Sequence, residues 1–319
     1  MKTTVSLLIL SLLFTLTLKS QNTHNFFQEG ETQLSINGVK HWVKISGVKN
    51  NTTPIVIIHG GPGGDNYTFE RIIGPSLEKF ASIIYYEQRG CGRSEAPEDT
   101  SDYTIPTLIK DLDKLREMIG LKKISLLGYS FGAELALRYA KHYPEKVDRL
   151  ILESPVELST YAKLIQIEGF YSIADSSFKE SIEEIVEGNT TINDKYFKVW
   201  SKASTPVVDK FLFLNQDVAA LNREMWENSN LESLGRRHFE RVIFESSKGD
   251  LLESVQGLET KCLIISGIHD KNGGFHYGRD LNKILPNSEL KLYRNSGHFP
   301  DMEEPEEFAR DIKNFVYRE

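Results

Sequence analysis

The sequence predicts an α/β protein with a mostly parallel sheet flanked by helices and with a helical cap inserted into it. The first observation is that short apolar runs, rich in β-branched residues, alternate with helical patterns along the chain. The second is that this alternation lapses between Val156 and Leu251, a span far longer than an ordinary connection. The apolar runs have the composition of buried strands: Pro54–Ile58, Ile83–Glu87, Ile124–Gly128, Leu150–Glu153 and Cys262–Gly267.

Helices are predicted between these strands. Thr104 is a good N-cap for a helix over Thr104–Ile119, and Pro106 suits the first turn of that helix. The remaining core elements are a helix over Phe131–His142, a strand over Glu289–Leu292 and a final helix over Pro305–Tyr317.

The two irregular parts of the chain are a hairpin and the cap. The runs Thr32–Ile36 and His41–Ile45 flank Asn37-Gly38, which is a strong signal for a hairpin turn. Long helical patterns rich in Glu, Lys and aromatic residues fill the span where the alternation lapses, and we interpret them as a cap; ordinary helices of a second layer are the alternative. The predicted organisation is a signal peptide over 1–20, a core over 21–155 and 252–319, and the cap over 156–251.

The first residues have the layout of a secretory signal peptide. Lys2 precedes an apolar run from Val5 to Leu18, which is shorter than the roughly 20 residues that span a bilayer. We therefore expect cleavage near Ser20 and export to the periplasm or the medium, without stable membrane association afterwards. An uncleaved anchor or a buried first helix is the alternative.

Composition narrows the classes of partner. The formal net charge of −7 disfavours nucleic acid and anionic membranes, so short peptides or small amide and ester molecules are the expected substrates. Cys91 and Cys262 are too few for a disulfide framework or a cysteine-rich metal site. A buried free thiol at Cys262 is favoured over a single bridge between the two. No pattern in the sequence indicates the oligomeric state.

A nucleophilic serine is predicted where the strand Ile124–Gly128 runs into the next helix. The residues at this junction read GYSFG, which is G-x-S-x-G in its strand–turn–helix setting. Glycines on both sides relieve the crowding of a sharp turn that exposes the hydroxyl of Ser130. A structural turn serine is the alternative.

A serine nucleophile needs a base and an orienting acid. His298 follows the last predicted strand and Asp270 follows the strand before it. Both are therefore expected at the same sheet edge as Ser130, because the carboxyl ends of parallel strands lie together. The chain order Ser, Asp, His is the order expected for this arrangement. Asp280 and Asp250 are the alternatives to Asp270, and a histidine that caps the last helix is the alternative to a catalytic base at His298.

A nucleophilic serine gives the glycine-rich segment after the strand Pro54–Ile58 an expected role in catalysis. A serine hydrolase stabilises the oxyanion of its tetrahedral intermediate with backbone N–H groups, one from the residue after the nucleophile and one from such a loop. Phe131, Gly60 and Gly61 are the expected donors. No Gly-Lys-Ser/Thr and no G-x-G-x-x-G follows, so phosphate and dinucleotide binding are disfavoured. Neither a metal nor an organic cofactor is expected.

Four motifs carry a family resemblance: HGGPGG at His59–Gly64, EQRGCGRS at Glu87–Ser94, GYSFGAELALRYAKHYPEKV from Gly128, and SGHFP around His298. Together they resemble the α/β-hydrolase fold, and specifically the prolyl aminopeptidase (proline iminopeptidase) family. The resemblance implies release of an N-terminal residue, often proline, from a short peptide through an acyl-enzyme. It also implies that Ser130, Asp270 and His298 form the triad.

The sequence departs from the family pattern at several positions. Glu87 stands where members usually have Asp, and Phe131 where they have Trp. In the family, acidic side chains of the cap bind the free α-amino group of the substrate. The segment Met225-Trp226-Glu227 resembles that part of the cap, so Glu227 is the expected amine-binding residue. The alternatives are Glu224, Glu245, or a cap helix with a merely solvated charged face.

Two further interpretations concern the arginines near the glycine-rich loop and the alternative functions of the chain. Arg89 and Arg93 are expected to order the loop around the oxyanion glycines rather than to contact substrate. A carboxylesterase or other acyl hydrolase with the same triad is the first alternative function, because fold and triad do not determine the substrate. A non-catalytic binding protein on a hydrolase scaffold is a more remote one.

Overall fold

The computed structural model describes residues 27–156, 159–231, 239–242, 244 and 250–318. Its centre is one sheet with the strand order β1-β2-β4-β3-β5-β6-β7-β8. Six strands, β3 to β8, run parallel to one another. At one edge of the sheet, β2 pairs antiparallel with β4, and β1 pairs antiparallel with β2. The strands are β1 (Gly30–Ile36), β2 (Val39–Ser46), β3 (Ile55–Ile58), β4 (Ile83–Tyr86), β5 (Ile124–Tyr129), β6 (Val147–Glu153), β7 (Lys261–Gly267) and β8 (Ser288–Tyr293).

The predicted fold class is therefore confirmed, with small differences at element ends. Asn37 and Gly38 have φ values of 47° and 84°, which is the conformation of the predicted hairpin turn. Strand β6 begins three residues before the predicted Leu150. The part that the hydrophobic pattern missed contains Asp148 and Arg149, which are only partly buried at the amino end of the strand.

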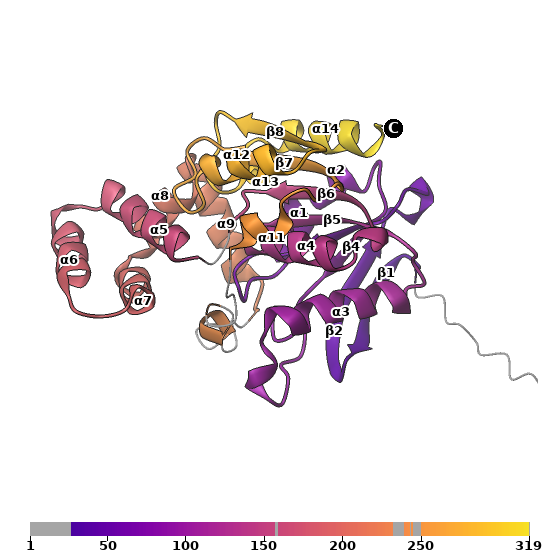
Figure 1. Ribbon diagram of the computed structural model, residues 1–319, viewed down its shortest axis with the longest axis horizontal. Coiled ribbons are helices and arrows are strands. Elements are labelled where there is room, and N and C mark those ends of the chain that lie inside the picture. Colours follow the sequence, from indigo (N-terminus) through magenta and orange to yellow (C-terminus); the bar gives the residue numbers. More distant parts are fainter. Residues whose placement is uncertain (1–26, 157–158, 232–238, 243, 245–249, 319) are drawn as a thin grey trace, which may run out of the picture.

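Helices cover both faces of the sheet (Figure 1). Along β3, Val56 and Ile58 belong to one apolar cluster, whereas Ile55 and Ile57 belong to the other. The first cluster packs under α3 and α4, and the second packs under α1, α2 and α14. These helices and their neighbours are α1 (Tyr67–Ile72), α2 (Gly74–Leu77), α3 (Ile105–Met118), α4 (Phe131–His142), α11 (Leu251–Val255), α12 (Phe275–Ile284), α13 (Pro300–Glu303) and α14 (Pro305–Val316).

A second group of helices lies between β6 and β7 in the chain. These are α5 (Thr160–Ile173), α6 (Ser176–Glu187), α7 (Ile192–Lys202), α8 (Thr205–Leu212) and α9 (Gln216–Asn228). Helices α5 to α8 have an apolar cluster of their own, in which the rings of Phe170 and Phe211 stack 4.0 Å apart, and Ala219 of α9 packs in a separate small cluster with Phe213 and Met302. Helices α5, α6 and α7 extend beyond the sheet at the left of Figure 1. The exact division at 155/156 and 251/252 stays a prediction.

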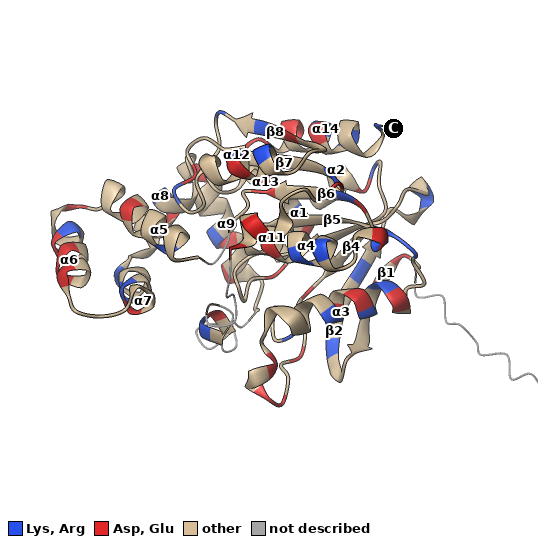
Figure 2. Cartoon of the chain, in the orientation of Figure 1, with Lys and Arg blue, Asp and Glu red and all other residues tan. Residues whose placement is uncertain are grey.

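Charged residues lie mainly on the outer helices, and the central strands β3 and β5 contain none (Figure 2). Both cysteines are buried and free, as expected for Cys262. Among the described residues, no helix is both long and apolar enough to cross a bilayer. The predicted signal peptide and Glu245 lie outside the described residues.

Candidate active site

Ser130 lies in the sharp turn between β5 and α4. Its backbone has φ 54° and ψ −124°, and its N–H donates to the carbonyl of Glu153 at 2.9 Å. The flanking glycines are required by space, because a Cβ on Gly132 would clash with the carbonyl oxygen of Ile58, and one on Gly128 with that of Gly132. The turn therefore holds the serine at the carboxyl end of the sheet, next to the N-terminus of a helix.

His298 and Asp270 lie together at the same edge. Nδ1 of His298 is 3.0 Å from Oδ2 of Asp270, and both side chains are almost fully buried. The other carboxylate oxygen of Asp270 accepts the backbone N–H groups of Asn272 and Gly273 at 2.8 and 3.2 Å. Burial raises the pKa of Asp270, but His298 and these two N–H groups outweigh it and leave the pKa below its usual value. The carboxylate is therefore ionised and orients the imidazole.

The alternative acids are far less suitable. Asp280 pairs with Lys283 one turn along α12, and Asp250 caps α11 by accepting the N–H of Glu253. Asp270 is thus the one of the three that contacts His298. The backbone N–H of His298 donates to the carbonyl of Leu212 at 2.7 Å. This hydrogen bond connects the loop that carries His298, called the histidine loop below, to the cap helix α8.

The glycine-rich loop approaches the serine closely. A Cβ on Gly60 would come within 2.9 Å of Cβ of Ser130, so only glycine fits there. His59 is fully buried, and burial lowers its pKa to about 4. Its Nε2 accepts the N–H of Gln88 at 3.0 Å, which leaves the proton on Nδ1 to be donated to the carbonyl of Gly60 at 3.0 Å. A neutral histidine therefore sets the start of this loop.

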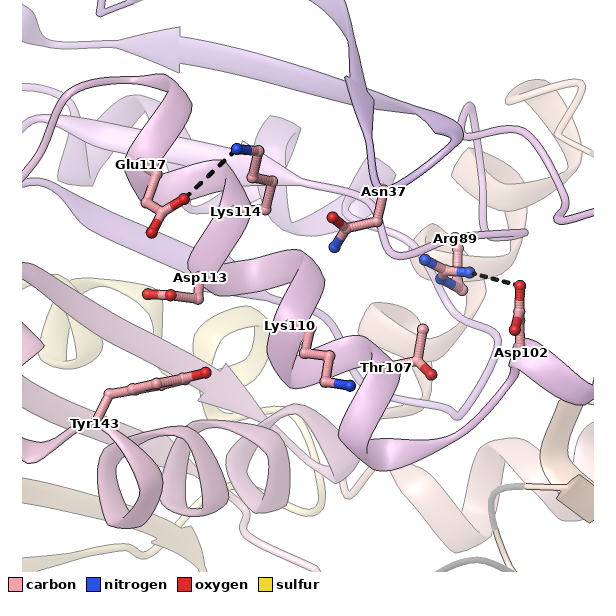
Figure 3. Close-up of a pocket in the computed structure, with 9 residues that line it drawn as sticks. All are labelled: Asn37, Arg89, Asp102, Thr107, Lys110, Asp113, Lys114, Glu117 and Tyr143. Carbon is pink, nitrogen blue, oxygen red and sulfur yellow. Dashed lines mark ion pairs between the residues drawn. The ribbon is translucent and has the colours of Figure 1, made fainter.

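Arginines order the neighbouring loop, as expected. Arg93 pairs with the buried carboxylate of Glu87 at 2.5 Å and with Glu70 at 3.1 Å. Arg89 forms a two-pronged pair with Asp111 at 2.6 and 2.8 Å. Arg89 also lines a polar groove along α3, where it lies 3.6 Å from Asp102 (Figure 3). This groove shares no lining residue with the cavity at Ser130.

A cavity of about 920 Å³ lies between the sheet edge and the cap. Ser130, His298, Gly60 and Gly61 line its floor. Phe131 does not line it; its side chain is buried in the core, and its N–H lies at the start of α4. The cap contributes aromatic side chains to the walls: Tyr196, Phe197, Trp200, Phe213, Trp226 and Phe244.

The expected amine-binding residues are placed elsewhere. Asn222 and Trp226 of α9 line the cavity, whereas Glu224 and Glu227 are exposed and do not line it. Helical geometry explains this for Glu224, which lies on the opposite face of α9 from Asn222 and Trp226. Glu227 is four residues after Arg223, which also lines the cavity, but the side chain of Glu227 is exposed outside it. The carboxylates that do line the cavity are Asp65, Asp194, Asp209 and Glu240. No pattern in the sequence singled these out.

In the part of the chain that the structure describes, no three His, Cys, Asp or Glu residues are grouped so that they could bind a metal ion. The groups gathered at Ser130 can support acyl transfer. They are a hydroxyl, an imidazole paired with a carboxylate, and the backbone of a glycine-rich loop.

Comparison with known proteins agrees with this geometry. A family model described as alpha/beta hydrolase fold matches residues 53–305, so the chain belongs to that family. A proline iminopeptidase of Saccharolobus solfataricus is 28% identical over 291 residues, covering 88% of this chain and 89% of that protein.

Two solved structures share the fold. The proline iminopeptidase-related protein of Thermus thermophilus superposes with a TM-score of 0.74 at 19% identity, covering 91% of this chain and 97% of the other. An esterase from Exiguobacterium antarcticum superposes with a TM-score of 0.64 at 19% identity, covering 91% and 100%. The chain is thus an α/β hydrolase that resembles proline iminopeptidases in sequence.

Proposed function

We propose that this protein is a serine aminopeptidase that releases an N-terminal residue from short peptides. The observation that carries the proposal is the gathering of Ser130, the His298–Asp270 pair and Gly60 at the floor of one cavity. The proline iminopeptidase relatives support the choice of a peptide substrate, and proline is the first residue to test.

The proposed reaction proceeds through an acyl-enzyme. Oγ of Ser130 attacks the carbonyl carbon of the first residue, while Nε2 of His298 takes the hydroxyl proton and passes it to the leaving amine. Asp270 keeps the proton on Nδ1 and stabilises the imidazolium. The N–H groups of Phe131 and of the loop at Gly60 and Gly61 stabilise the oxyanion. Water then attacks the ester, with His298 as base, and releases the amino acid.

Recognition of a free α-amino group requires a carboxylate in the cavity. Of the four carboxylates that line the cavity, Asp209 and Glu240 are the candidates that we propose. Asp65 accepts the backbone N–H of Tyr67 at the start of α1, and Asp194 accepts the hydroxyl of Thr191 at the start of α7. Asp209 pairs with Arg223, so an incoming ammonium would compete with the guanidinium for this carboxylate. We expect Asp209→Asn or Glu240→Gln to raise KM for a free-amine substrate at least tenfold. The matched control is Glu227→Gln, which changes an exposed carboxylate outside the cavity.

An acyl hydrolase acting on esters is the second candidate. The same triad and loop serve ester cleavage, and the esterase noted above has the same fold. A non-catalytic scaffold is a third reading, and a Ser130→Ala variant with unchanged turnover would support it.

The deciding experiment compares a proline anilide that has a free amine with its N-acetylated form, with alanine and leucine anilides, and with a simple aryl ester. We expect cleavage of free-amine anilides only, and a loss of roughly 10⁴-fold or more in kcat for Ser130→Ala. Equal cleavage of the acetylated anilide, or activity on the ester alone, would contradict the aminopeptidase proposal and favour the esterase alternative.

We also propose that the protein is exported. The support is the signal-like pattern from Lys2 to Leu18. Expression in a bacterial host should yield extracytoplasmic protein whose mass corresponds to cleavage near Ser20. Recovery of the uncleaved chain from the cytoplasm would contradict export.

A further inference from the structure

The imidazole of His298 has a hydrogen-bond partner at each of its two nitrogen atoms. Nδ1 lies 3.0 Å from the Asp270 carboxylate, and Nε2 lies 3.0 Å from Nδ2 of Asn272. A carboxylate only accepts, so Nδ1 carries the proton, and the Nε2 lone pair accepts an N–H of the Asn272 amide. The carbonyl oxygen of the same amide is buried and has no hydrogen-bond partner.

This contact occupies the lone pair that catalysis requires. A neutral imidazole has one lone pair on Nε2, which serves either the Asn272 amide or the Ser130 hydroxyl at full strength. Asn272 and Ser130 both line the cavity floor with His298. Moreover, the backbone N–H of Asn272 donates to Asp270 at 2.8 Å, so the asparagine belongs to the same loop that orients the imidazole.

We propose that Asn272 is a positioning residue that holds His298 in a resting state, from which substrate binding transfers Nε2 to the Ser130 hydroxyl. The inference rests on the proposed serine mechanism. The unpartnered carbonyl oxygen of Asn272 supplies the means of release, because a substrate N–H that reaches it draws the amide away from Nε2. Asn272 thereby keeps the serine weakly activated until the cavity is filled.

The first test uses no substrate. An organofluorophosphonate reacts with an activated serine, and mass spectrometry gives the rate of labelling at Ser130. Asn272→Leu preserves the approximate volume and removes the donor, so we expect labelling to be about fivefold faster, the change that corresponds to one hydrogen bond. Asn222→Leu alters another cavity-lining asparagine, for which no contact with His298 is found, and is not expected to accelerate labelling. A rate in Asn272→Leu equal to or below that of the wild type would overturn the proposal.

The second test measures proximity to Nε2 and does not depend on the leucine variant folding well. In Asn272→Asp a carboxylate replaces the amide beside Nε2 and favours the imidazolium, so the pH of half-maximal labelling should rise by about one unit. The charged groups already close to His298 are Asp270 and Asp301, and both remain in every variant. Asn222→Asp should produce a much smaller rise. Equal profiles for the two aspartate variants would overturn the proposal.

Different results would contradict the serine mechanism and the role of Asn272. If the wild-type chain is not labelled at Ser130 at any pH, the serine mechanism is wrong and the role of Asn272 falls with it. If the wild type is labelled but the Asn272 variants behave like the Asn222 variants, only the resting-state proposal is wrong.

Discussion

At the scale of single residues, the site depends on glycines that stand where no other side chain fits. Ser130 has a positive φ of 54°, which costs energy for a residue with a Cβ, and the surrounding turn must hold it there. Gly132, the second residue of α4, lies directly against the carbonyl end of β3, next to the glycine loop. Strand, loop and helix therefore meet at one close backbone contact.

This contact leads to a prediction for Gly132→Ala. The added methyl group would collide with the carbonyl oxygen of Ile58, so helix α4 must move away from β3 and carry Ser130 with it. We expect a loss of about 1–3 kcal/mol in the free energy of unfolding and a loss of labelling of Ser130. Urea unfolding and fluorophosphonate labelling measure the two effects. Gly188→Ala at the end of α6 is the control, since its φ is −60° and its nearest neighbour is 3.3 Å away. Unchanged stability and labelling in Gly132→Ala would show that this contact can accommodate a methyl group.

At the scale of elements, the core was predictable because its strands are continuous apolar runs and its turns have distinctive residues. Asp270 was predictable for the same reason, since it follows the apolar run of β7, whereas His298 follows β8, which is only partly buried and alternates polar and apolar residues. The cap was predictable only as helical. Which side of α9 faces the cavity depends on packing against the core, so the sequence favoured Glu227 although it is exposed. Asn272 had no signal at all, because its role depends on a three-dimensional contact with His298.

The cap helix α8 links stability to binding, which predicts the effect of Phe211→Ala. Phe211 is fully buried in the cap cluster, and the carbonyl of the next residue, Leu212, accepts the N–H of His298. Truncation should cost about 3–5 kcal/mol of stability and loosen a wall of the cavity. We expect KM to rise by a larger factor than kcat falls, as measured by steady-state kinetics on a good anilide substrate. Leu221→Ala, at an exposed position of α9, should change neither parameter. An unchanged KM in Phe211→Ala would contradict this coupling.

At the scale of the whole molecule, a buried carboxyl pair connects the serine turn to the histidine loop. The carbonyl of Glu153 accepts the N–H of Ser130, and its side chain accepts the N–H of Asp301 at 2.9 Å. Both carboxyl groups are nearly fully buried, and each has one oxygen without a partner. Burial raises the pKa of Asp301 to about 6, and burial together with the charge of Asp301 raises the pKa of Glu153 well above its usual value. The pair therefore retains at least one proton at neutral pH.

This pair predicts a pH-dependent stability difference between the wild type and Glu153→Gln. Because both pKa values are higher in the folded than in the unfolded chain, the folded protein binds more protons, and the contribution of the pair to stability is lost as pH rises from about 4 through about 6 and beyond. Glutamine keeps an acceptor for the Asp301 N–H, offers a donor to its carboxylate and cannot ionise. Relative to the wild type, the variant should therefore gain about 1–3 kcal/mol in the free energy of unfolding between pH 4 and pH 8. Urea unfolding at pH 4, 6 and 8 measures this, with Glu145→Gln at an exposed position as the control. Parallel stability curves for the wild type and Glu153→Gln would mean that the pair does not titrate differently on folding, and that hydrogen bonds alone join the serine turn to the histidine loop.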